Sequence, residues 1–300
     1  MTVATPPLVK DTTPKKAKSP TAEVWDNLRR STSGMIGLSL IIGHLLLALS
    51  APFITPKDPF RMDAPNRRIM PTSEFWFGTD ETGRDIFSRS MMGGRTLITV
   101  TIIGTFMAMS WGGFVGILLG FVGGRVDDIA MRLVDAFLAI PWLLFLLLIV
   151  SVVGTEPWVQ ALTFGFFYGI PVIRVARAAT HDYVTREFIL AARARGESKR
   201  DVVIKELLPN VMDIMLVEGA MRWSWMLLAF TSLSYLGFGV APPAVDWGRM
   251  ISDSRKILAL QPWATFGPVL MLSSLIIGLN LFADALAKAL GLDRSQGAPL

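Results

Sequence analysis

The sequence has no cysteine and only two histidines, His44 and His181. Without cysteine there can be no disulfide bond, thiolate nucleophile or cysteine-based metal site. Two distant histidines do not make up a zinc site, which needs three or four protein ligands, so His44 is expected to be a packing residue. The sequence also lacks the Gly-x-x-x-x-Gly-Lys-Ser/Thr phosphate loop and the His-Glu-x-x-His motif of metalloproteases. We therefore predict no catalytic, cofactor-binding or metal-binding residue, and no enzyme.

Charged residues are also scarce, at 18% of the 300 residues, against roughly 25% in soluble domains. Hydrophobic residues make up 52% and gather in blocks close to the ~20 residues that cross a bilayer. The net charge of +5 would suggest nucleic acid for a soluble protein. Here the basic residues flank the apolar blocks, as they do in cytoplasmic loops of membrane proteins. We predict an all-α membrane protein whose function is transport. It is not expected to bind nucleic acid.

Six apolar blocks are predicted to cross the membrane as helices. They lie at about 34–54, 96–121, 129–153, 158–173, 211–233 and 263–286. A signal peptide cleaved near Ala48-Leu49-Ser50 is the alternative for the first block, but the preceding polar stretch is longer than a usual n-region. Arg29 and Arg30 before the first block, and eight basic residues in 174–210, predict that these parts and both termini are cytoplasmic.

The predicted organisation follows from these blocks. Residues 1 to about 22 are expected to be disordered, because they are rich in Pro, Thr and Lys and can bury little apolar surface. The predicted parts are a cytoplasmic tail (1–33), a first transmembrane helix (34–54), an extracytoplasmic loop (55–95), a five-helix core (96–290) with a polar helical segment at 180–210, and a cytoplasmic tail (291–300).

The polar segment 180–210 is predicted to form two short helices joined by a corner. The first helix is expected from Tyr183 to Arg195, and Gly196 suits the left-handed residue that ends a helix. Ser198 and the acidic residue three positions later fit a capping box that starts the second helix, and Pro209 is expected to end it. The local pattern alone leaves open whether this is a loop on the membrane surface or a docking element.

A resemblance to a known family favours docking. The stretch Ala191-Ala192-Arg193-Ala194-Arg195-Gly196, followed by Leu207-Leu208-Pro209-Asn210, resembles the cytoplasmic "EAA" loop of ABC-importer permeases. In that family the loop seats in a cleft of the ATP-hydrolysing subunit. The resemblance implies ATPase coupling by Ala191, Ala192, Arg193, Ala194, Arg195, Gly196, Leu208 and Pro209. Leu190 stands where the family often has glutamate, which puts one polar contact to the ATPase in doubt.

Three further stretches resemble the C-type permease subunits of the oligopeptide, dipeptide and nickel ABC importers. They are Phe77 to Asp80 with Gly83 to Arg89, Met131 to Asp135 with Ala139-Ile140-Pro141, and Ser232 to Val240 with Pro242-Pro243 and Trp247-Gly248. The resemblance implies the type I ABC importer permease architecture in a bacterial inner membrane. It also implies a second homologous permease, two ATPase subunits that bind ATP and Mg, and an extracytoplasmic substrate-binding protein.

Peptides are the expected cargo, with nickel chelates, glutathione and opines as alternatives. An ion-driven secondary transporter is the rival from another class. Such proteins commonly show internal repeats, and no convincing repeat relates the two halves of this sequence.

Several residues within or beside the spans are candidates for function. Glu218 and Arg222 are spaced as a helical ion pair, which either faces the translocation path or is buried against a neighbouring helix. Asn280 is a further candidate for the path. Candidates for the outer gate or for docking the binding protein are Asp80, Arg84, Asp85, Trp247 and Arg249, the alternative being solvated loops.

Two further patterns concern packing. Gly112, Gly116, Gly120 and Gly124 recur every four residues, which lets helices approach closely. Arg132 and Asp135, one turn apart, are expected to pair with each other.

Overall fold

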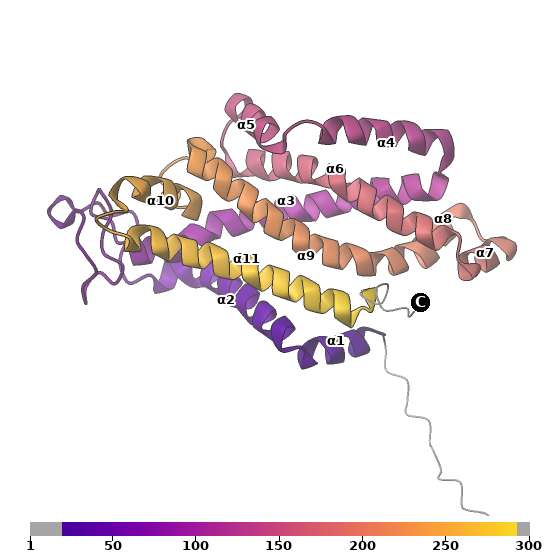
Figure 1. Ribbon diagram of the computed structural model, residues 1–300, viewed down its shortest axis with the longest axis horizontal. Coiled ribbons are helices and arrows are strands. Elements are labelled where there is room, and N and C mark those ends of the chain that lie inside the picture. The colour runs from indigo at the N-terminus through magenta and orange to yellow at the C-terminus, as the bar shows by residue number, and fades with distance from the viewer. Residues whose placement is uncertain (1–19, 293–300) are drawn as a thin grey trace, which may run out of the picture.

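The computed structural model describes residues 20–292, which form helices and connecting loops without a β-strand. The long helices lie along one axis, with α7 and α8 at one end and α10 and the loop before α3 at the other (Figure 1). The helices are α1 (Pro20–Arg30), α2 (Thr32–Ile54), α3 (Ile86–Val122), α4 (Gly124–Leu138), α5 (Trp142–Val153), α6 (Pro157–Val184), α7 (Glu187–Ala194), α8 (Lys199–Asp201), α9 (Leu208–Leu233), α10 (Trp247–Ser254) and α11 (Trp263–Ala289), with a 3-10 turn at Ala64–Asn66 and at Arg255–Ile257 and a π turn at Val202–Leu207 and at Ser234–Phe238.

The predicted disordered tail lies outside the described residues up to residue 19, and residues 20–22 already belong to α1. Helix α1 is separated from α2 by Ser31, whose hydroxyl oxygen accepts a hydrogen bond from the Gly34 N–H at 3.2 Å. Such side-chain caps satisfy one of the free N–H groups at a helix start. The first predicted span coincides with α2, which is long and apolar enough to cross a membrane.

Helices α3 and α6 pack closely along a seam of glycines. A Cβ at Gly112, Gly116 or Gly120 would lie 2.3–2.7 Å from a backbone oxygen of α6, so no larger residue fits. Gly124 is not part of this seam, because it starts α4 with a φ of +65° and a Cβ added there would have no atom of another residue packed against it within 4 Å. The predicted glycine ridge is therefore a packing surface made of three glycines.

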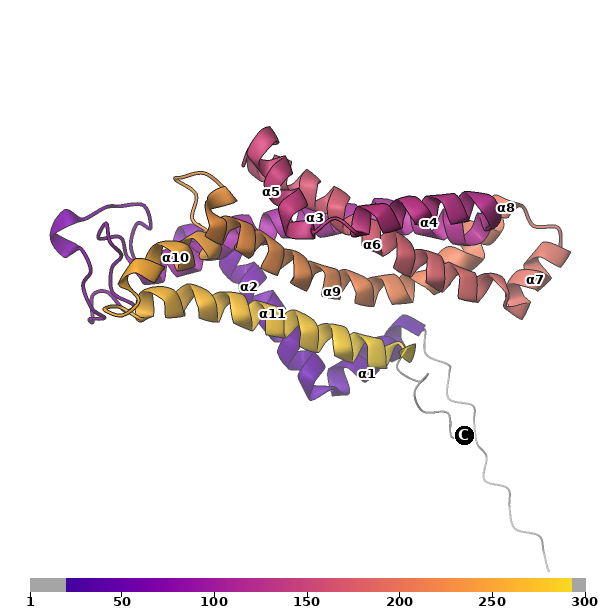
Figure 2. The ribbon, with the colours of Figure 1, turned by 45° about the horizontal axis from the view of Figure 1, so that its top comes forward.

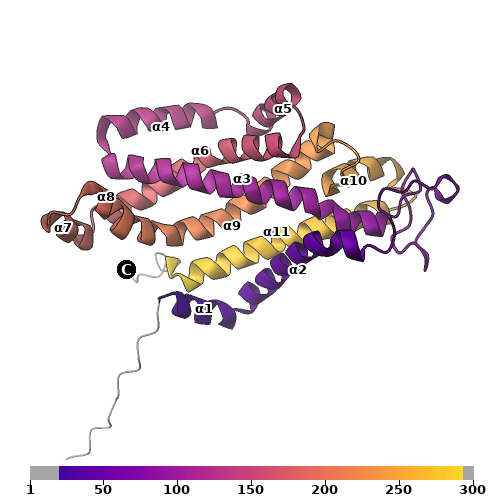
Figure 3. The same cartoon turned by 180° about the vertical axis from the view of Figure 1, so that it is seen from behind.

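Helices α2 and α11 form a second close pair, seen from behind in Figure 3. A Cβ at Gly37 of α2 would lie 2.6 Å from the backbone oxygen of Gly278 of α11. His44 joins the same two helices. Its Nδ1 lies 2.8 Å from the Leu40 oxygen and its Nε2 lies 3.1 Å from the Ser274 hydroxyl, so it is a helix-contact residue as expected.

By length and composition, four helices of the described residues can cross a membrane: α2, α3, α6 and α11. Helices α4 and α5 together make a fifth candidate. The predicted third span, 129–153, is wrong as one straight helix, because the two helices are bent by 79° at a short break (Figure 2). Pro141 lies at this break, where it removes a backbone donor and disfavours helical geometry at Ile140.

Two other predicted segments end at different residues in the structure. The outer loop ends at Asp85 rather than 95, since the Asp85 carboxylate accepts a hydrogen bond from the Ser88 N–H at 2.9 Å and caps α3. The fourth span continues beyond 173 to Val184. Its added turns carry Arg177, which binds both carboxylate oxygens of Asp127 of α4 at 2.5 Å. Asp135 pairs with Arg174 of α6 rather than with Arg132, which corrects the expected pair.

Pro209 does not end a helix, contrary to the prediction. The backbone passes from α8 through the π turn Val202–Leu207 directly into α9, with the Leu208 N–H bonded to the Val203 oxygen five residues earlier. This wider turn precedes Pro209, which then lies in the first turn of α9, where a missing N–H costs little. The corner at Gly196 is followed by one continuous helical path into α9.

Candidate functional site

The corner between α7 and α8 lies at one end of the bundle, and we call residues 187–207 the inner elbow (Figure 1). Gly196 has a φ of +80°, and its N–H bonds to the Arg193 oxygen at 3.0 Å. The Glu197 N–H bonds to the Ala192 oxygen at 3.2 Å. These two bonds form a Schellman motif, in which the left-handed residue is best supplied by glycine. The predicted stop at Gly196 is confirmed.

The inner elbow has a buried base. Ile189, Ala192, Val202 and Leu207 are each at most 1% exposed and form one apolar cluster. Ser198 starts α8, where its hydroxyl oxygen accepts from the Asp201 N–H at 3.1 Å and its hydroxyl donates to the Asp201 carboxylate at 2.6 Å. The capping residues are the predicted ones, although the carboxylate binds the serine hydroxyl rather than a backbone N–H. The base fixes the angle between the two arms of the elbow.

Above this base, most of the predicted coupling residues face outward. Ala192 is the buried exception. The exposed members are Ala191, Arg193, Ala194, Arg195, Gly196, Leu208 and Pro209, and Leu190 beside them is 53% exposed. Two of the cations are held in place, since Arg193 lies 5.3 Å from the centre of the Phe121 ring and Arg195 lies 2.6 Å from the Glu197 carboxylate. The elbow thus presents small apolar side chains ringed by fixed positive charges.

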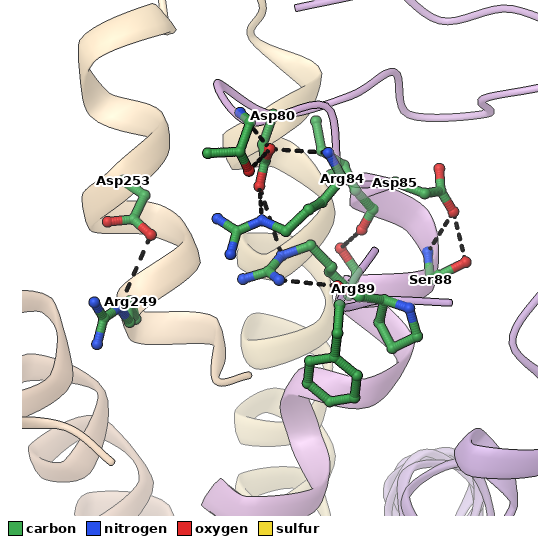
Figure 4. A network of polar contacts seen from close by, with 12 residues as sticks. Asp80, Arg84, Asp85, Ser88, Arg89, Arg249 and Asp253 are labelled. Atoms are coloured by element: carbon green, nitrogen blue, oxygen red, sulfur yellow. Dashed lines mark hydrogen bonds and ion pairs between the residues drawn. The ribbon is translucent and has the colours of Figure 1, made fainter. Parts of the chain in front are cut away.

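At the opposite end, residues 55–89 and α10 form what we call the outer cap (Figure 4). One Asp80 carboxylate oxygen accepts bonds from Thr82 and from the Arg84 N–H, and the other accepts from Arg84 Nε at 2.7 Å. Burial alone would raise the pKa of Asp80, but these hydrogen bonds and the Arg84 charge lower it below its ordinary value. Arg89, which sequence reasoning did not select as a site residue, is 5% exposed and binds the Pro59 oxygen at 3.0 Å.

Trp247 fastens α10 to α3. The side chain is 1% exposed, its indole N–H donates to the Ser90 oxygen at 2.7 Å, and its ring lies against Gly93 and Gly94. Trp247 therefore cannot touch a binding protein while α10 stays in place. Arg249 is the most accessible member of the predicted group, with a side chain that is 40% exposed, against 20% for Arg84 and 18% for Asp80, and its Nε lies 4.0 Å from the Asp253 carboxylate.

Asp246 caps α10 from a buried position. Its carboxylate accepts from the Arg249 N–H at 2.9 Å and from the Ser234 hydroxyl. The second carboxylate oxygen is buried without a partner. Burial raises the pKa of Asp246 above its ordinary value, although its hydrogen bonds act in the other direction. Asp80, Asp85 and Asp246 are thus structural members of the outer cap, bound to their own backbone and neighbours.

Halfway between the two ends, Glu218 and Arg222 of α9 form the ion pair that their spacing predicts. Arg222 also lines a cavity of about 380 Å³ at the break between α4 and α5. Asn280 is not part of this group. Its amide donates to the Ser224 hydroxyl at 3.1 Å, and Ser224 lies on a different face of α9 from the ion pair. Among the described residues, no group of three His, Cys, Asp or Glu could hold a metal ion.

Comparison with known proteins identifies the family. Residues 112–294 match the family described as the binding-protein-dependent transport system inner membrane component. Residues 19–71 match the N-terminal TM domain of oligopeptide transport permease C. The chain belongs to this family, the permease subunits of ABC importers. It is accordingly a multi-pass protein of the bacterial inner membrane.

Individual permeases resemble this one along most of its length. The dipeptide transport system permease protein DppC of Alkalihalophilus pseudofirmus is 31% identical over 276 residues, covering 91% of this chain and 90% of that protein. The oligopeptide transport system permease protein OppC of Bacillus subtilis is 30% identical, covering 92% and 90%. The nickel transport system permease protein NikC of Escherichia coli is 33% identical, covering 87% and 95%.

The family match covers the three sites of this permease unequally. The inner elbow, the Glu218–Arg222 pair and α10 all lie within residues 112–294. Asp80, Arg84 and Asp85 lie between the two matched segments. Within the part of the outer cap that precedes α3, residues 55–71 belong to the N-terminal match and residues 72–85 lie outside both matched segments.

Proposed function

We propose that this permease forms half of the translocation path of an ATP-driven importer for peptides. A second, related permease would form the other half. Two ATPase subunits, which bind ATP and Mg, would sit against the inner elbows, and an extracytoplasmic binding protein would deliver cargo to the outer caps. ATP hydrolysis belongs to the ATPase subunits in this proposal, and the permease supplies the path and the lever.

The observation that carries this proposal is the construction of the inner elbow. A partner could grip its exposed alanines and arginines, while the buried cluster around Ala192 and Val202 keeps the elbow from deforming. The elbow also continues through the π turn into α9, which carries Arg222. A push on the elbow is therefore a push on the helix that lines the middle of the bundle. Drawing two elbows together would open the path outward, and hydrolysis would reset it inward.

The same arrangement supports a definite topology. Helix α1 and the end of α11 lie at the same end of the bundle as the inner elbow (Figure 1). The cluster of basic residues in 174–205 favours a cytoplasmic position for that end. With α9 and the bent pair α4–α5 counted as spans, the proposal is a six-span permease with both termini inside.

For the cargo, peptides are favoured over nickel chelates. The N-terminal match is to oligopeptide permeases, and two of the relatives described above are named for dipeptide or oligopeptide transport. The nickel permease NikC is the specific observation in favour of the second candidate. Uptake of radiolabelled dialanine and of nickel into proteoliposomes that hold the whole importer separates the two.

Purification of the tagged permease under mild conditions tests the proposed coupling. We compare wild type with Gly196→Pro. Proline cannot adopt the φ of +80°, and it has no N–H to donate the hydrogen bond to the Arg193 oxygen. Gly291→Pro is a matched control. Gly291 also has a positive φ, +72°, and its N–H caps α11 by bonding to the Lys288 oxygen.

The expected result is that wild type and Gly291→Pro bring along an ATPase and a second permease. Gly196→Pro should keep the second permease and lose the ATPase, as identified by mass spectrometry. If wild type purifies without an ATPase, the importer proposal fails and ion-driven transport becomes the leading alternative. If Gly196→Pro keeps its ATPase, the elbow is not the docking element.

A further inference from the structure

The cavity beside Arg222 lies at mid-height in the bundle. Its walls come from the break between α4 and α5 (138–142), from Phe167, Tyr168 and Pro171 of α6, and from Arg222 and Trp225 of α9. These positions of α6 and α9 are near the middle of both helices. A volume of about 380 Å³ falls within the range of roughly 300–1,000 Å³ that small-molecule sites occupy.

Arg222 brings unused hydrogen-bond donors to this cavity. A guanidinium has five N–H groups, and one nitrogen of Arg222, Nη2, is bound to the Glu218 carboxylate. The Nε atom is buried and has no partner. The Arg222 side chain is 18% exposed and lines the cavity, so its other guanidinium N–H groups are the donors that a ligand there can reach. Glu218, 7% exposed, does not line the cavity and instead holds Arg222 from behind.

The rest of the cavity suits a small amphipathic ligand. Tyr168, Phe167 and the two tryptophans Trp142 and Trp225 give it aromatic walls. Apolar walls with one or two placed polar groups are the usual composition of a ligand site. Trp225 is 63% exposed and Trp142 is 42% exposed, so the cavity is open on the side away from this bundle.

Backbone carbonyl groups add hydrogen-bond acceptors to the cavity, which complement the donors of Arg222. Pro171 offers no N–H to the carbonyl of Phe167 four residues earlier, and both residues line the cavity. At the break, the Asp135 and Phe137 carbonyls accept bonds from the Ala139 and Ile140 N–H groups, and the carbonyl of Leu138, the last residue of α4, lies beyond these bonds. Interrupted helices of this kind present free backbone groups to cargo in other transporters. Carbonyls can accept hydrogen bonds from an ammonium group while Arg222 binds a carboxylate.

We propose that this cavity is a cargo site in the permease itself, in which Arg222 binds the carboxylate of a small zwitterionic peptide. The inference rests on the proposed function, because it takes the open side of the cavity to face the translocation path. It goes further by naming the chemical group that is recognised and the residue that recognises it. Selection would then occur in the membrane as well as in the binding protein.

Cysteine protection tests this proposal, since the chain has no cysteine of its own. Ile140, a lining residue that is 40% exposed, is replaced in Ile140→Cys. The whole importer carrying this variant is placed in lipid nanodiscs without binding protein. Labelling of this chain by N-ethylmaleimide is followed by intact mass, in the presence of dialanine or of its C-terminal amide.

Dialanine should slow the labelling, and the amide should need about ten to a hundred times the concentration, which is the loss expected for a hydrogen bond to a charged group. In the background of Ile140→Cys, the double variant Glu218→Gln/Arg222→Gln should abolish the preference. Changing both members avoids leaving one buried charge unpaired. Arg95→Gln, at an exposed arginine of α3, is the control and should keep the preference.

Equal protection by the two compounds would overturn the proposal, and so would a preference that survives in the double variant. If the double variant fails to assemble, the comparison of the two compounds on Ile140→Cys still decides. If dialanine gives no protection but is taken up normally, the proposed cargo site is wrong and the proposed importer function stands. If dialanine gives protection but is not taken up, the cargo site is supported and the proposal of peptide import is wrong.

Discussion

The inner elbow and the outer cap lie at opposite ends of the same helices, and both carry sequence motifs in polar segments (Figure 3). They differ in where those motifs point. The elbow buries Ala192 and Leu207 and leaves the other predicted coupling residues exposed. The cap does the reverse, since Thr79, Asp85, Arg89 and Trp247 are each at most 5% exposed.

This difference separates two reasons for which a motif can exist. Side chains that are exposed on a rigid base contribute little to the fold of their own chain, so they suit recognition by a partner. A motif that is buried and hydrogen-bonded to its own backbone holds a loop in shape. In the outer cap, α3 joins two parts, which are α10 and the loop that precedes α3. The outer cap therefore behaves as one piece. Variants at the two ends should therefore fail in different ways.

The largest loss of stability is expected for Trp247→Ala. Removing a fully buried tryptophan leaves a cavity beside Gly93 and Gly94 and frees the Ser90 carbonyl, which together cost about 3–5 kcal/mol. Thermal unfolding of the detergent-solubilised permease measures the change. Trp76→Ala, in the same cap but 59% exposed, is the control and should cost less than half as much. Equal losses would mean that the cap is not built around Trp247.

A smaller loss is expected for Asp85→Ala. This variant removes the carboxylate that caps α3 at the Ser88 N–H, which costs about 0.5–2 kcal/mol. Asp85→Asn keeps an acceptor oxygen at the same place and should recover most of that loss. The same unfolding experiment compares the two. An asparagine variant as unstable as the alanine variant would show that charge, rather than capping, is what the site needs.

At the inner elbow, neighbouring alanines provide a sharper test. Ala191 is exposed, so Ala191→Glu should change the free energy of unfolding by less than about 0.5 kcal/mol while it weakens retention of the ATPase. Ala192 is 0% exposed, so Ala192→Glu should lower both stability and ATPase retention. Unfolding and co-purification are measured on the same samples. If the Ala191→Glu protein keeps its ATPase, the exposed residues of the elbow do not serve docking, and the difference drawn between the two ends does not hold.

Sequence reasoning succeeded where the signal is local. The glycine that ends α7 and the serine that starts α8 act within a few residues of themselves, so Gly196 and Ser198 could be read directly. The long apolar helices were also found, because hydrophobicity is summed over a window. Pro209 misled the prediction, since the rule that proline ends a helix assumes α geometry, and the π turn before it changes that geometry.

The failures concern contacts between distant parts of the chain. Trp247 is buried by Ser90, which lies 157 positions earlier in the sequence. Asp135 pairs with Arg174, 39 positions away, although Arg132 is much nearer in sequence. Pro141 marks the break between α4 and α5 in the sequence, but the apolar run continues through it, so the bend of 79° could not be predicted. Each of these depends on which helices lie side by side, and no local pattern records that.

The smallest effect is expected from pH at the outer cap, where two carboxyl groups act in opposite directions. The folded-state pKa of Asp246 lies above its ordinary value of 3.8, because burial disfavours the charged form. The folded protein therefore holds this proton more tightly than the unfolded chain does. The contribution of Asp246 to stability falls as the pH rises from the ordinary value through the higher folded value. The pKa of Asp80 is lowered, so its contribution is present above the ordinary value and is lost as the pH falls.

Asp246→Asn should therefore flatten the fall in stability that Asp246 causes as the pH rises above its ordinary pKa of 3.8. Asparagine still offers an oxygen to the Arg249 N–H, so the cap of α10 is kept. Unfolding temperatures across this range, for wild type and variant, give the difference. Asp80→Asn is the counterpart and should be less stable than wild type at neutral pH, because the bond from Arg84 loses its charged acceptor. If both variants shift the profile in the same direction, burial does not control the charge of Asp246, and the outer cap is more open to water than its packing implies.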